Sequence, residues 1–308
     1  GALEGQTMIR GQIALRSMGF ESIPIFNIEN ACASASSAFN LAVQYVRSGA
    51  GEIALAIGAE KMFCADKAKM FSVFDGAWDV ATVEDNKRRL LQMGHGIEPP
   101  EGSMSKAPYS LFMDIYAAFG RFHMREFGTT QRQIAAVSAK NHGHSVHNPL
   151  AQYRNAYTIE EVLAAPPITY PLTLPMCAPI SDGAAAVVVC SEAALARLAN
   201  RGRAIKVLAS IIATGSNRLP ENLDQHITVK AAKQAYELAG VGPQDISLAE
   251  VHDATAIGEI VQSENLGFCA FGEGGPLAER GDTTIGGRIP INTSGGLESK
   301  GHPIGATG

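Results

Sequence analysis

Short apolar segments alternate with helical patterns along much of the chain, and this alternation constrains the fold more than any other feature. Residues 24–30 read as a strand, a helical pattern follows from Ala35, and residues 52–58 form a continuous apolar run. Runs that are apolar throughout are typical of strands buried in a parallel sheet. The first part of the chain therefore predicts a β-α-β unit, preceded by a helix within residues 6–18.

The same alternation returns later in the chain, after a different kind of sequence. The segment from about residue 62 to 169 is rich in Met, aromatic and charged residues, and we interpret it as an insertion that covers the sheet. Strands alternating with helices on both sides of it indicate a layered α/β architecture. The further predicted strands are 182–190, 204–213, 247–251 and 289–293, and the further predicted helices are 110–127, 130–141, 191–199, 227–239 and 256–266.

Cys32 lies at the tight turn between strand 24–30 and the helix that follows it. A thiol at such a corner faces the N-terminus of the helix, where unpaired N–H groups and the positive end of the helix dipole favour the thiolate. A buried structural cysteine is the commoner interpretation of an isolated Cys in an apolar context. Two histidines far downstream favour the nucleophile instead.

His252 is the first of these histidines. It ends the predicted strand 247–251 and precedes Asp253 at the start of a helix. In open α/β sheets, the carboxyl ends of the strands hold ligands. The alternative is that Asp253 serves as a helix N-cap and His252 is an ordinary surface residue.

His302 is the second, and its surroundings are more specific. It stands between Gly301 and Pro303 in a glycine-rich segment that ends at Gly308. The proline disfavours helical backbone at His302, and the glycines allow the backbone to approach a ligand closely. A thiol combined with two imidazoles suits acyl transfer through a thioester. We therefore expect Cys32 to act together with both histidines.

Composition excludes several other classes of protein. The 308 residues are 46% hydrophobic, allow about two domains, and contain no apolar run near the roughly 20 residues of a membrane span. A net charge of -5 gives no reason to expect a nucleic-acid surface. The five scattered cysteines fit neither a disulfide framework nor a zinc ribbon, so we expect a reducing compartment such as the cytoplasm. We interpret the cluster of His142, His144 and His147 as a polar helix end rather than a metal site.

These motifs resemble the thiolase superfamily, in the branch of sterol-carrier-protein-2 thiolases and lipid-transfer thiolases, over essentially the whole chain. The segments that carry the resemblance are Asn-Ala-Cys32-Ala-Ser, Ala-Ile-Gly-Ala-Glu60-Lys61-Met62, Lys140-Asn-His-Gly-His-Ser-Val-His-Asn-Pro149, Ser181-Asp-Gly-Ala-Ala-Ala186, His252-Asp253 and Ser294-Gly-Gly-Leu-Glu-Ser-Lys-Gly-His-Pro-Ile-Gly-Ala-Thr-Gly308. The resemblance implies an α-β-α-β-α sandwich of two similar halves, residues 1–203 and 204–308, with a loop domain at about 62–169 inserted in the first.

The resemblance also implies an activity, that of a thiolase-type acyl-CoA C-acyltransferase. Such an enzyme cleaves a 3-oxoacyl-CoA with CoA, or catalyses the reverse Claisen condensation, through an acyl-cysteine. Cys32 resembles the family nucleophile, His302 the histidine that activates it, and His252 a residue of the oxyanion hole for the enolate. CoA and acyl-CoA are substrates, and no permanently bound cofactor or metal is implied. The positions expected to line the CoA tunnel are Leu174, Cys177, Ala178, Ala254 and Thr255.

The sequence departs from the family pattern in two places. Sterol-carrier-type thiolases usually carry His-Asp-Cys-Phe, whereas the third and fourth positions here are Ala254 and Thr255. The family's other acid/base cysteine, in a Cys-x-Gly-x-Gly motif, normally lies beyond the position of Gly308. We therefore expect these residues to be part of a longer chain of roughly 390, judged from the family pattern rather than from domain statistics.

The resemblance leaves other functions open. A related lipid-transfer branch performs CoA-dependent retro-aldol cleavage with tyrosines in place of the nucleophilic cysteine, and the presence of Cys32 argues against it. The further alternatives are a thiolase-like subunit of a multicomponent acyltransferase and a noncatalytic carrier of acyl-CoA or lipid. The family implies a homodimer, and some subunits of this branch work with a small OB-fold protein that carries a zinc ribbon.

Overall fold

The computed structural model describes residues 2–308, which form two compact units. The first unit comprises the chain up to Trp78 together with Ile180–Ile212 and His302–Gly308, and the second comprises Asp79–Pro179 and Ala213–Gly301. Each unit has one short antiparallel sheet among its described residues. These are β1 (Ile53–Glu60) with β4 (Gly183–Cys190), and β2 (Pro167–Thr169) with β3 (Leu172–Thr173).

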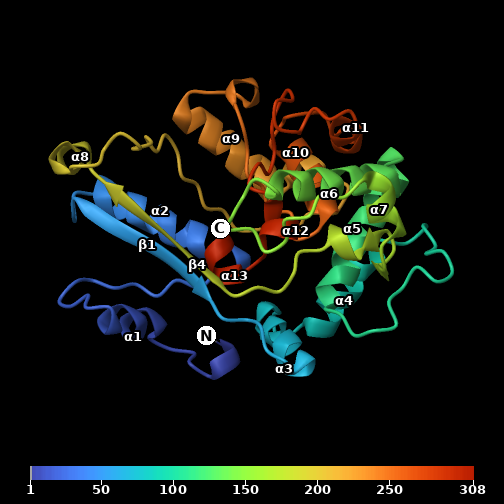
Figure 1. Ribbon diagram of the computed structural model, residues 1–308, viewed down its shortest axis with the longest axis horizontal. Coiled ribbons are helices and arrows are strands. Elements are labelled where there is room, and N and C mark those ends of the chain that lie inside the picture. The colour runs from blue at the N-terminus through green and yellow to red at the C-terminus, as the bar shows by residue number, and fades with distance from the viewer. Residues whose placement is uncertain (1) are drawn as a thin grey trace. The chain divides into compact units, whose positions relative to one another are not determined.

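The first unit is built on the antiparallel ribbon of β1 and β4. Ile53 lies opposite Cys190 at one end of the ladder, and Glu60 lies opposite Gly183 at the other. Helix α2 (Ser34–Arg47) packs along this ribbon (Figure 1). The other helical segments of the unit are α1 (Arg10–Ser17), α3 (Lys67–Ser72), α8 (Glu192–Arg197), α13 (Ile304–Thr307) and the 3-10 turns Ala2–Glu4, Ala31–Ala33 and Val73–Ala77.

The short helix α13 packs on β1 at a glycine. A Cβ atom on Gly58 would lie only 2.7 Å from the Cα of Ala306 and 3.1 Å from the Cβ of Ala35. Ser36, in the first turn of α2, donates a hydrogen bond of 2.8 Å to the carbonyl of Gly308. The absence of a side chain at position 58 therefore lets α13 lie against both β1 and the start of α2.

The second unit is mainly helical and is centred on α6 (Gln131–Ser145). Ile134, Ala135 and Val137 of this helix are fully buried and share a core with Ile257 and Ile260. Figure 1 shows α6 among the helices that pack against it. The helices of the unit are α4 (Val83–Gln92), α5 (Leu111–Phe127), α6, α7 (Ile159–Ala164), α9 (Ile227–Ala239), α10 (Ala256–Asn265), α11 (Gly274–Glu279), α12 (Gly296–Lys300) and the 3-10 turns Leu174–Met176, Leu223–Gln225 and Pro243–Asp245.

Local sequence explains where α5 ends and α6 begins. Gly128 follows α5 with φ 73°, a left-handed conformation that glycine adopts without strain. Thr130 then caps α6, because its hydroxyl accepts the N–H of Gln133 while the Gln133 side chain accepts the N–H of Thr130. The predicted helices at 110–127, 130–141, 191–199, 227–239 and 256–266 are confirmed. Within residues 2–308, none of the helices has both the length and the apolar character that a membrane crossing needs.

The predicted strand directions require a correction. The apolar run at 52–58 is part of a strand, but β1 pairs antiparallel with β4, and residues 24–30 have no assigned strand, so the predicted parallel β-α-β unit is not formed. The strand is not buried throughout either, because Ile53 and Leu55 are exposed. An apolar run carries no information about the direction of its neighbour. Segments 247–251 and 289–293 share only one parallel bridge, between Ala249 and Ile291.

Side chains replace the missing ladders in two places. Residues 24–30 and 204–212 have no assigned strand, and α2 holds the second segment through Asn40, which donates to the carbonyl of Ser210, and Arg47, which donates to the carbonyls at 207 and 208. In the second unit, the Asn292 side chain accepts the N–H of Val251 at 2.8 Å. Strand-like composition at these positions therefore reflects extended packing rather than a ladder.

We expect Gly58→Ala to destabilise the first unit, because the added methyl group must push α13 away from β1. Overpacking of this kind typically costs about 1–3 kcal/mol of unfolding free energy. Urea unfolding of the full-length protein measures it, with Gly202→Ala as the matched control, since a Cβ there meets nothing within 4 Å. Equal unfolding midpoints for the two variants would contradict the close packing of α13.

Candidate active site

Cys32 occupies a strained turn at the start of α2. It is the middle residue of the 3-10 turn Ala31–Ala33, directly before Ser34 begins the helix. Ala31 has φ 45°, a left-handed conformation that residues other than glycine rarely adopt. Two hydrogen bonds of 2.8 Å fix it: its N–H donates to the Glu29 carboxylate, and its carbonyl accepts the Ser34 hydroxyl. Such backbone strain, of order 1–3 kcal/mol, is typical of functional sites.

The first unit also brings His302 to this turn. A ring nitrogen of His302 lies within 4.8 Å of the Cys32 sulfur. The imidazole is oriented by a hydrogen bond of 2.9 Å between its Nδ1 and the Thr307 hydroxyl, and its backbone N–H donates to the hydroxyl of Ser181 at 3.1 Å. A thiol and an imidazole that are distant in the sequence are therefore neighbours in one compact unit.

Burial raises the pKa of the Cys32 thiol to about 11, and only the hydrogen bond to the backbone of Cys32 itself opposes this. The sequence argument predicts the opposite direction, because it considers only the helix N-terminus. A helix terminus is worth about 0.3–1 kcal/mol at most exposed sites, whereas desolvation can shift a pKa by several units. The thiol is therefore protonated at neutral pH, and attack on a substrate requires a base to remove its proton.

His252 lies in the second unit, after an extended segment that the Asn292 side chain holds in place. Its Nε2 is 3.5 Å from the hydroxyl oxygen of Tyr116 on α5. Burial lowers the pKa of His252 below its ordinary value, because desolvation disfavours the imidazolium. A neutral imidazole offers one donor and one acceptor nitrogen at neutral pH.

Two segments predicted to line the CoA tunnel meet beside His252. Cys177 forms an antiparallel bridge with Thr255, and the N–H of Ala178 donates to the carbonyl of Ala254 at 2.9 Å. Leu174 is exposed, whereas Ala254 and Thr255 are buried. Their role in binding CoA stays a prediction.

Burial raises the pKa of Cys177 strongly, and the nearby carboxylate of Glu298 adds to the effect, so this second thiol is poorly suited to act as a nucleophile.

A buried polar network, which the sequence analysis missed, lies directly behind His252. The Nδ2 of Asn141 donates to carboxylate oxygens of Asp253, Glu259 and Glu298 at 3.1, 3.1 and 3.2 Å. The Lys140 ammonium pairs with Glu259 at 2.6 Å. All five side chains are buried, and the ammonium pairs with one of the three carboxyl groups, that of Glu259. The sequence signal that could have revealed the network is the presence of polar residues within predicted helices that are otherwise apolar.

The network raises the pKa of two of its carboxyl groups, which favours their neutral forms. Burial raises the pKa of Asp253 and of Glu298 well above their ordinary values. The negative charge of Asp253 adds to the shift of Glu298, and the negative charge of Glu259 adds to both shifts. Asp253 is not simply an N-cap, because its Oδ1 accepts the N–H of Leu297 at 2.7 Å. The residue after His252 is thereby fastened to α12.

The histidine cluster at 142–147 is not a polar helix end, and this interpretation is wrong for two of its three members. His142 and His144 are buried. His142 Nε2 bonds to the carbonyl of Pro175 at 3.1 Å, and His144 bonds to the carbonyl of Asn292 and to the N–H of Ile285. These imidazoles join α6 to neighbouring loops, and His147 alone is exposed.

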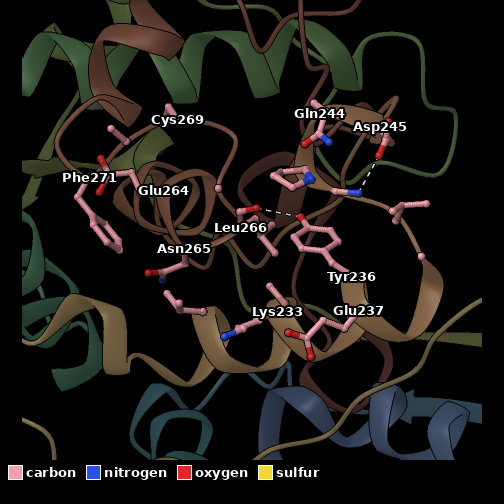
Figure 2. A pocket seen from close by; sticks show the side chains of 18 residues that line it. Lys233, Tyr236, Glu237, Gln244, Asp245, Glu264, Asn265, Leu266, Cys269 and Phe271 are labelled. Atoms are coloured by element: carbon pink, nitrogen blue, oxygen red, sulfur yellow. Dashed lines mark hydrogen bonds between the residues drawn. The ribbon is translucent and has the colours of Figure 1, made fainter.

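The second unit also contains an open cavity of about 830 Å³ between α9, the turn at 240–245 and the end of α10. Figure 2 shows Lys233, Tyr236 and Cys269 on its walls. The hydroxyl of Tyr236 donates to the carbonyl of Leu266 at 2.9 Å. Burial raises the pKa of Cys269 to about 12, and the carboxylate of Glu264 adds to the effect. The cavity contains none of the three predicted catalytic residues.

Comparison with protein families decides the relationship. Residues 1–160 match the family model described as "Thiolase, N-terminal domain", and residues 212–307 match "Thiolase C-terminal domain-like". The chain belongs to the thiolase family. The predicted α/β thiolase-like architecture is confirmed, whereas the predicted boundary between halves at 203 and 204 stays a prediction.

Individual relatives agree with the predicted branch of the thiolases. The chain is 37% identical over 308 residues to sterol carrier protein 2 of Homo sapiens, a match that covers 97% of this chain and 53% of the relative. It is 39% identical over 293 residues to acetyl-CoA acetyltransferase of Methanothermobacter thermautotrophicus, covering 94% and 70%. The chain thus spans about half the length of the sterol carrier relatives that it matches.

A solved structure shares the fold. The structure described as "Ltp2-ChsH2(DUF35) aldolase" superposes with a TM-score of 0.68 at 24% sequence identity, covering 97% of this thiolase chain and 74% of that chain. At this sequence identity, the structural similarity establishes the fold of the chain alone.

We expect Glu298→Gln to make the stability of the protein less sensitive to pH. The folded-state pKa of Glu298 lies above its unfolded value, so its contribution to stability is complete below about pH 4 and is lost as the pH rises. Each unit of this shift is worth about 1.4 kcal/mol. Between pH 5.5 and pH 8, urea unfolding should show a smaller loss of unfolding free energy for the variant than for the wild type.

Glu237→Gln on α9 is the matched control, because that carboxylate is exposed. This control should change the unfolding free energy by the same amount at pH 5.5 and at pH 8. If Glu298→Gln also changes the unfolding free energy equally at both pH values, Glu298 is already ionised in the folded protein.

Proposed function

We propose that this protein is a thiolase-type acyl-CoA C-acyltransferase that works through an acyl-cysteine at Cys32. The observation that supports it best is the thiol at the N-terminus of α2 with an imidazole nitrogen of His302 within 4.8 Å. Membership of the thiolase family makes CoA thioesters the expected substrates. The reaction is thiolytic cleavage of a 3-oxoacyl-CoA or the reverse Claisen condensation.

In the proposed acylation step, His302 takes the proton of the Cys32 thiol as the sulfur attacks. In the condensing direction, the sulfur adds to the carbonyl carbon of an acyl-CoA, and the bond from that carbon to the CoA sulfur breaks. The CoA thiolate leaves with the proton from the imidazolium. The raised pKa of Cys32 supports this coupled transfer, because little free thiolate exists before substrate arrives.

The second proposed step forms or breaks the carbon–carbon bond. In cleavage, Cys32 attacks C3 of the 3-oxoacyl-CoA, and the electron pair of the C2–C3 bond leaves as an enolate of the shorter acyl-CoA. A proton then reaches C2, and CoA releases the acyl group from Cys32. We assign to His252 a hydrogen bond to the enolate oxygen, a role for which its N–H must reach the substrate held by Cys32.

The lowered pKa of His252 fits the donor role, because a neutral imidazole keeps one N–H available for the enolate oxygen, and a lowered pKa makes it a weaker base. The alternative is that His252 also moves the proton on C2, a task that falls to a cysteine in other members of the branch. Here position 254 is alanine, so the alternative is worth testing.

A CoA-dependent retro-aldolase is the second candidate, because the "Ltp2-ChsH2(DUF35) aldolase" shares the fold and its description includes a DUF35 component. The Cys32 and His302 pair favours acyl transfer over this candidate. A noncatalytic carrier would not need a base beside a thiol. We further propose that the protein is a cytoplasmic homodimer. If it is a retro-aldolase instead, we expect it to work with a small OB-fold partner protein.

Mass spectrometry of the full-length protein incubated with acyl-CoA should find the acyl group on Cys32. Cys32→Ser should abolish the adduct while leaving CoA binding nearly intact, because the change removes the nucleophile and little volume. His302→Ala should slow adduct formation by roughly 100- to 10,000-fold, the range typical of a lost general base. An acyl group found only on Cys64 or Cys177 would refute the assignment.

His252→Asn distinguishes the two roles of His252, because it keeps a hydrogen-bond donor and removes the group that can transfer a proton. If His252 only donates, the variant should keep most of the exchange of the acetyl-CoA α-protons with deuterated water, followed by NMR. Loss of that exchange, with acyl-Cys32 formation intact, would show that His252 is the base.

A further inference from the structure

Asn292 lies beside the extended segment that ends at His252, and its backbone is left-handed. Its φ is 54°, in a region that asparagine enters more readily than most residues other than glycine. The residue is fully buried and belongs to the second unit, as His252 does. Backbone of this kind persists only where the surroundings determine it, and it is commonest at functional sites.

The segments that carry Asn292 and His252 begin a parallel ladder. The N–H of Asn292 donates to the carbonyl of Ala249 at 2.8 Å, as such a ladder requires. In a regular parallel ladder, the N–H of Val251 would next donate to the backbone carbonyl of Asn292. Here it donates to the Oδ1 of Asn292, also at 2.8 Å. A side-chain amide therefore takes the place of one backbone acceptor directly before His252.

The backbone carbonyl of Asn292 is held by two other donors. It accepts the Nδ1–H of His144 at 3.0 Å and the N–H of Gly295 at 2.9 Å. The N–H of Ile285 donates to the Nε2 of His144 at 3.1 Å. Because a carbonyl only accepts and a backbone N–H only donates, these partners fix His144 as a neutral imidazole with its proton on Nδ1. His144 thus helps to keep the carbonyl of Asn292 turned away from Val251.

The nitrogen of the same amide is fixed as well. The Nδ2 of Asn292 donates to the Oε2 of Glu259 on α10 at 2.8 Å. The amide therefore has one orientation, with its oxygen toward the N–H of Val251 and its nitrogen toward the carboxylate of Glu259. Val251 precedes His252 in the chain, and α10 follows it, so the two bonds act on both sides of the histidine.

A second side chain continues this pattern. The N–H of Ser294 would be the next donor in the ladder, to the carbonyl of Val251. It donates instead to the Oε1 of Glu250 at 2.9 Å. Side chains rather than backbone groups therefore join the two segments next to His252.

We propose that Asn292 is a positioning residue for His252, and that its side-chain amide sets where the backbone of His252 lies. The amide acts on the backbone, and the contacts of the imidazole itself come in addition. A donor to the enolate oxygen must be placed closely, because a displacement of about 1 Å can slow a reaction about 100-fold. This role in catalysis rests on the proposed function, whereas the hold on Val251 does not.

Hydrogen exchange of the Val251 amide in the full-length protein tests the hold without substrate. Asn292→Gly accepts the left-handed backbone without strain and removes only the amide, so it should speed this exchange by roughly 3- to 10-fold, the effect of one ordinary hydrogen bond. The N–H of Ala249 should keep its exchange rate, because its partner is the backbone carbonyl of Pro290 at 3.0 Å. Unchanged exchange at Val251, or equal acceleration at both amides, would overturn the proposal.

A measurement on the wild type needs no variant. In NMR, the scalar coupling across the hydrogen bond should join the amide nitrogen of Val251 to the side-chain Cγ of Asn292. A coupling to the backbone carbonyl carbon of Asn292 would instead describe a regular ladder and contradict the proposed hold.

Kinetics then test the role. Asn292→Gly should slow the carbon–carbon step by roughly 10- to 100-fold, while acyl-Cys32 forms at the wild-type rate, because Cys32 and His302 lie in the first unit. Asn265→Ala is the matched control, since it removes a buried amide that bonds to His226 at 3.2 Å at the last residue of α10. It should leave both steps unchanged. A similar loss in the two variants would indicate general destabilisation rather than positioning.

A double-mutant cycle tests whether Asn292 acts through His252. Adding Asn292→Gly to His252→Ala should slow the carbon–carbon step little further, because the group that Asn292 places is already gone. The full 10- to 100-fold loss in both backgrounds would refute the positioning role. If the wild type forms no acyl-Cys32 at all, the proposed function fails, and the exchange of the Val251 amide still decides whether Asn292 holds this segment.

Discussion

The organisation of the second unit depends on burying three carboxyl groups around two side-chain amides, those of Asn141 and Asn292, and one ammonium. Asn141 and Lys140 of α6 reach Asp253, Glu259 and Glu298, which come from three different segments. Removing charges from water is costly, and the attraction of one ion pair seldom exceeds that cost. The network therefore contributes less to total stability than to specifying one arrangement of α6, α10 and α12, and protonation of Asp253 and Glu298 limits the buried charge.

That arrangement determines the environment of His252. Asp253 is fastened to α12, Val251 is fastened to Asn292, and the imidazole between them faces the hydroxyl of Tyr116. A histidine on a free loop would sample many orientations, whereas this one is fixed on both sides by its backbone. The first unit uses a different device, in which strained Ala31 and the missing side chain of Gly58 allow α13, Cys32 and His302 to approach one another.

Much of this could be predicted from the sequence, because its signals are local. Helix α2 was located from the spacing of its apolar residues, and Cys32 from the corner at which it stands. The direction of β1 was not predictable, since the same apolar run pairs equally well in either sense. Likewise, segment 204–212 resembles a strand because it is extended and packed, yet α2 satisfies part of its backbone through Asn40 and Arg47.

The site was predicted less completely, because its electrostatics depend on residues that are distant in sequence. Nothing in the text around Cys32 indicates how deeply the thiol is buried, and burial reverses the direction of its pKa shift. The carboxyl network was also missed, because Asn141, Glu259 and Glu298 look like ordinary helix residues when each is considered alone. The sequence thus located the candidate side chains but did not indicate how burial shifts their pKa values.

The high pKa of Cys32 has a consequence for resistance to oxidation. Peroxides attack the thiolate and react far more slowly with the protonated thiol. A nucleophile that remained ionised between turnovers would be exposed to sulfenic and then irreversible sulfinic acid formation whenever substrate was scarce. If Cys32 loses its proton only as the sulfur attacks, as proposed, the waiting thiol reacts slowly with peroxides, and its burial protects the proposed nucleophile.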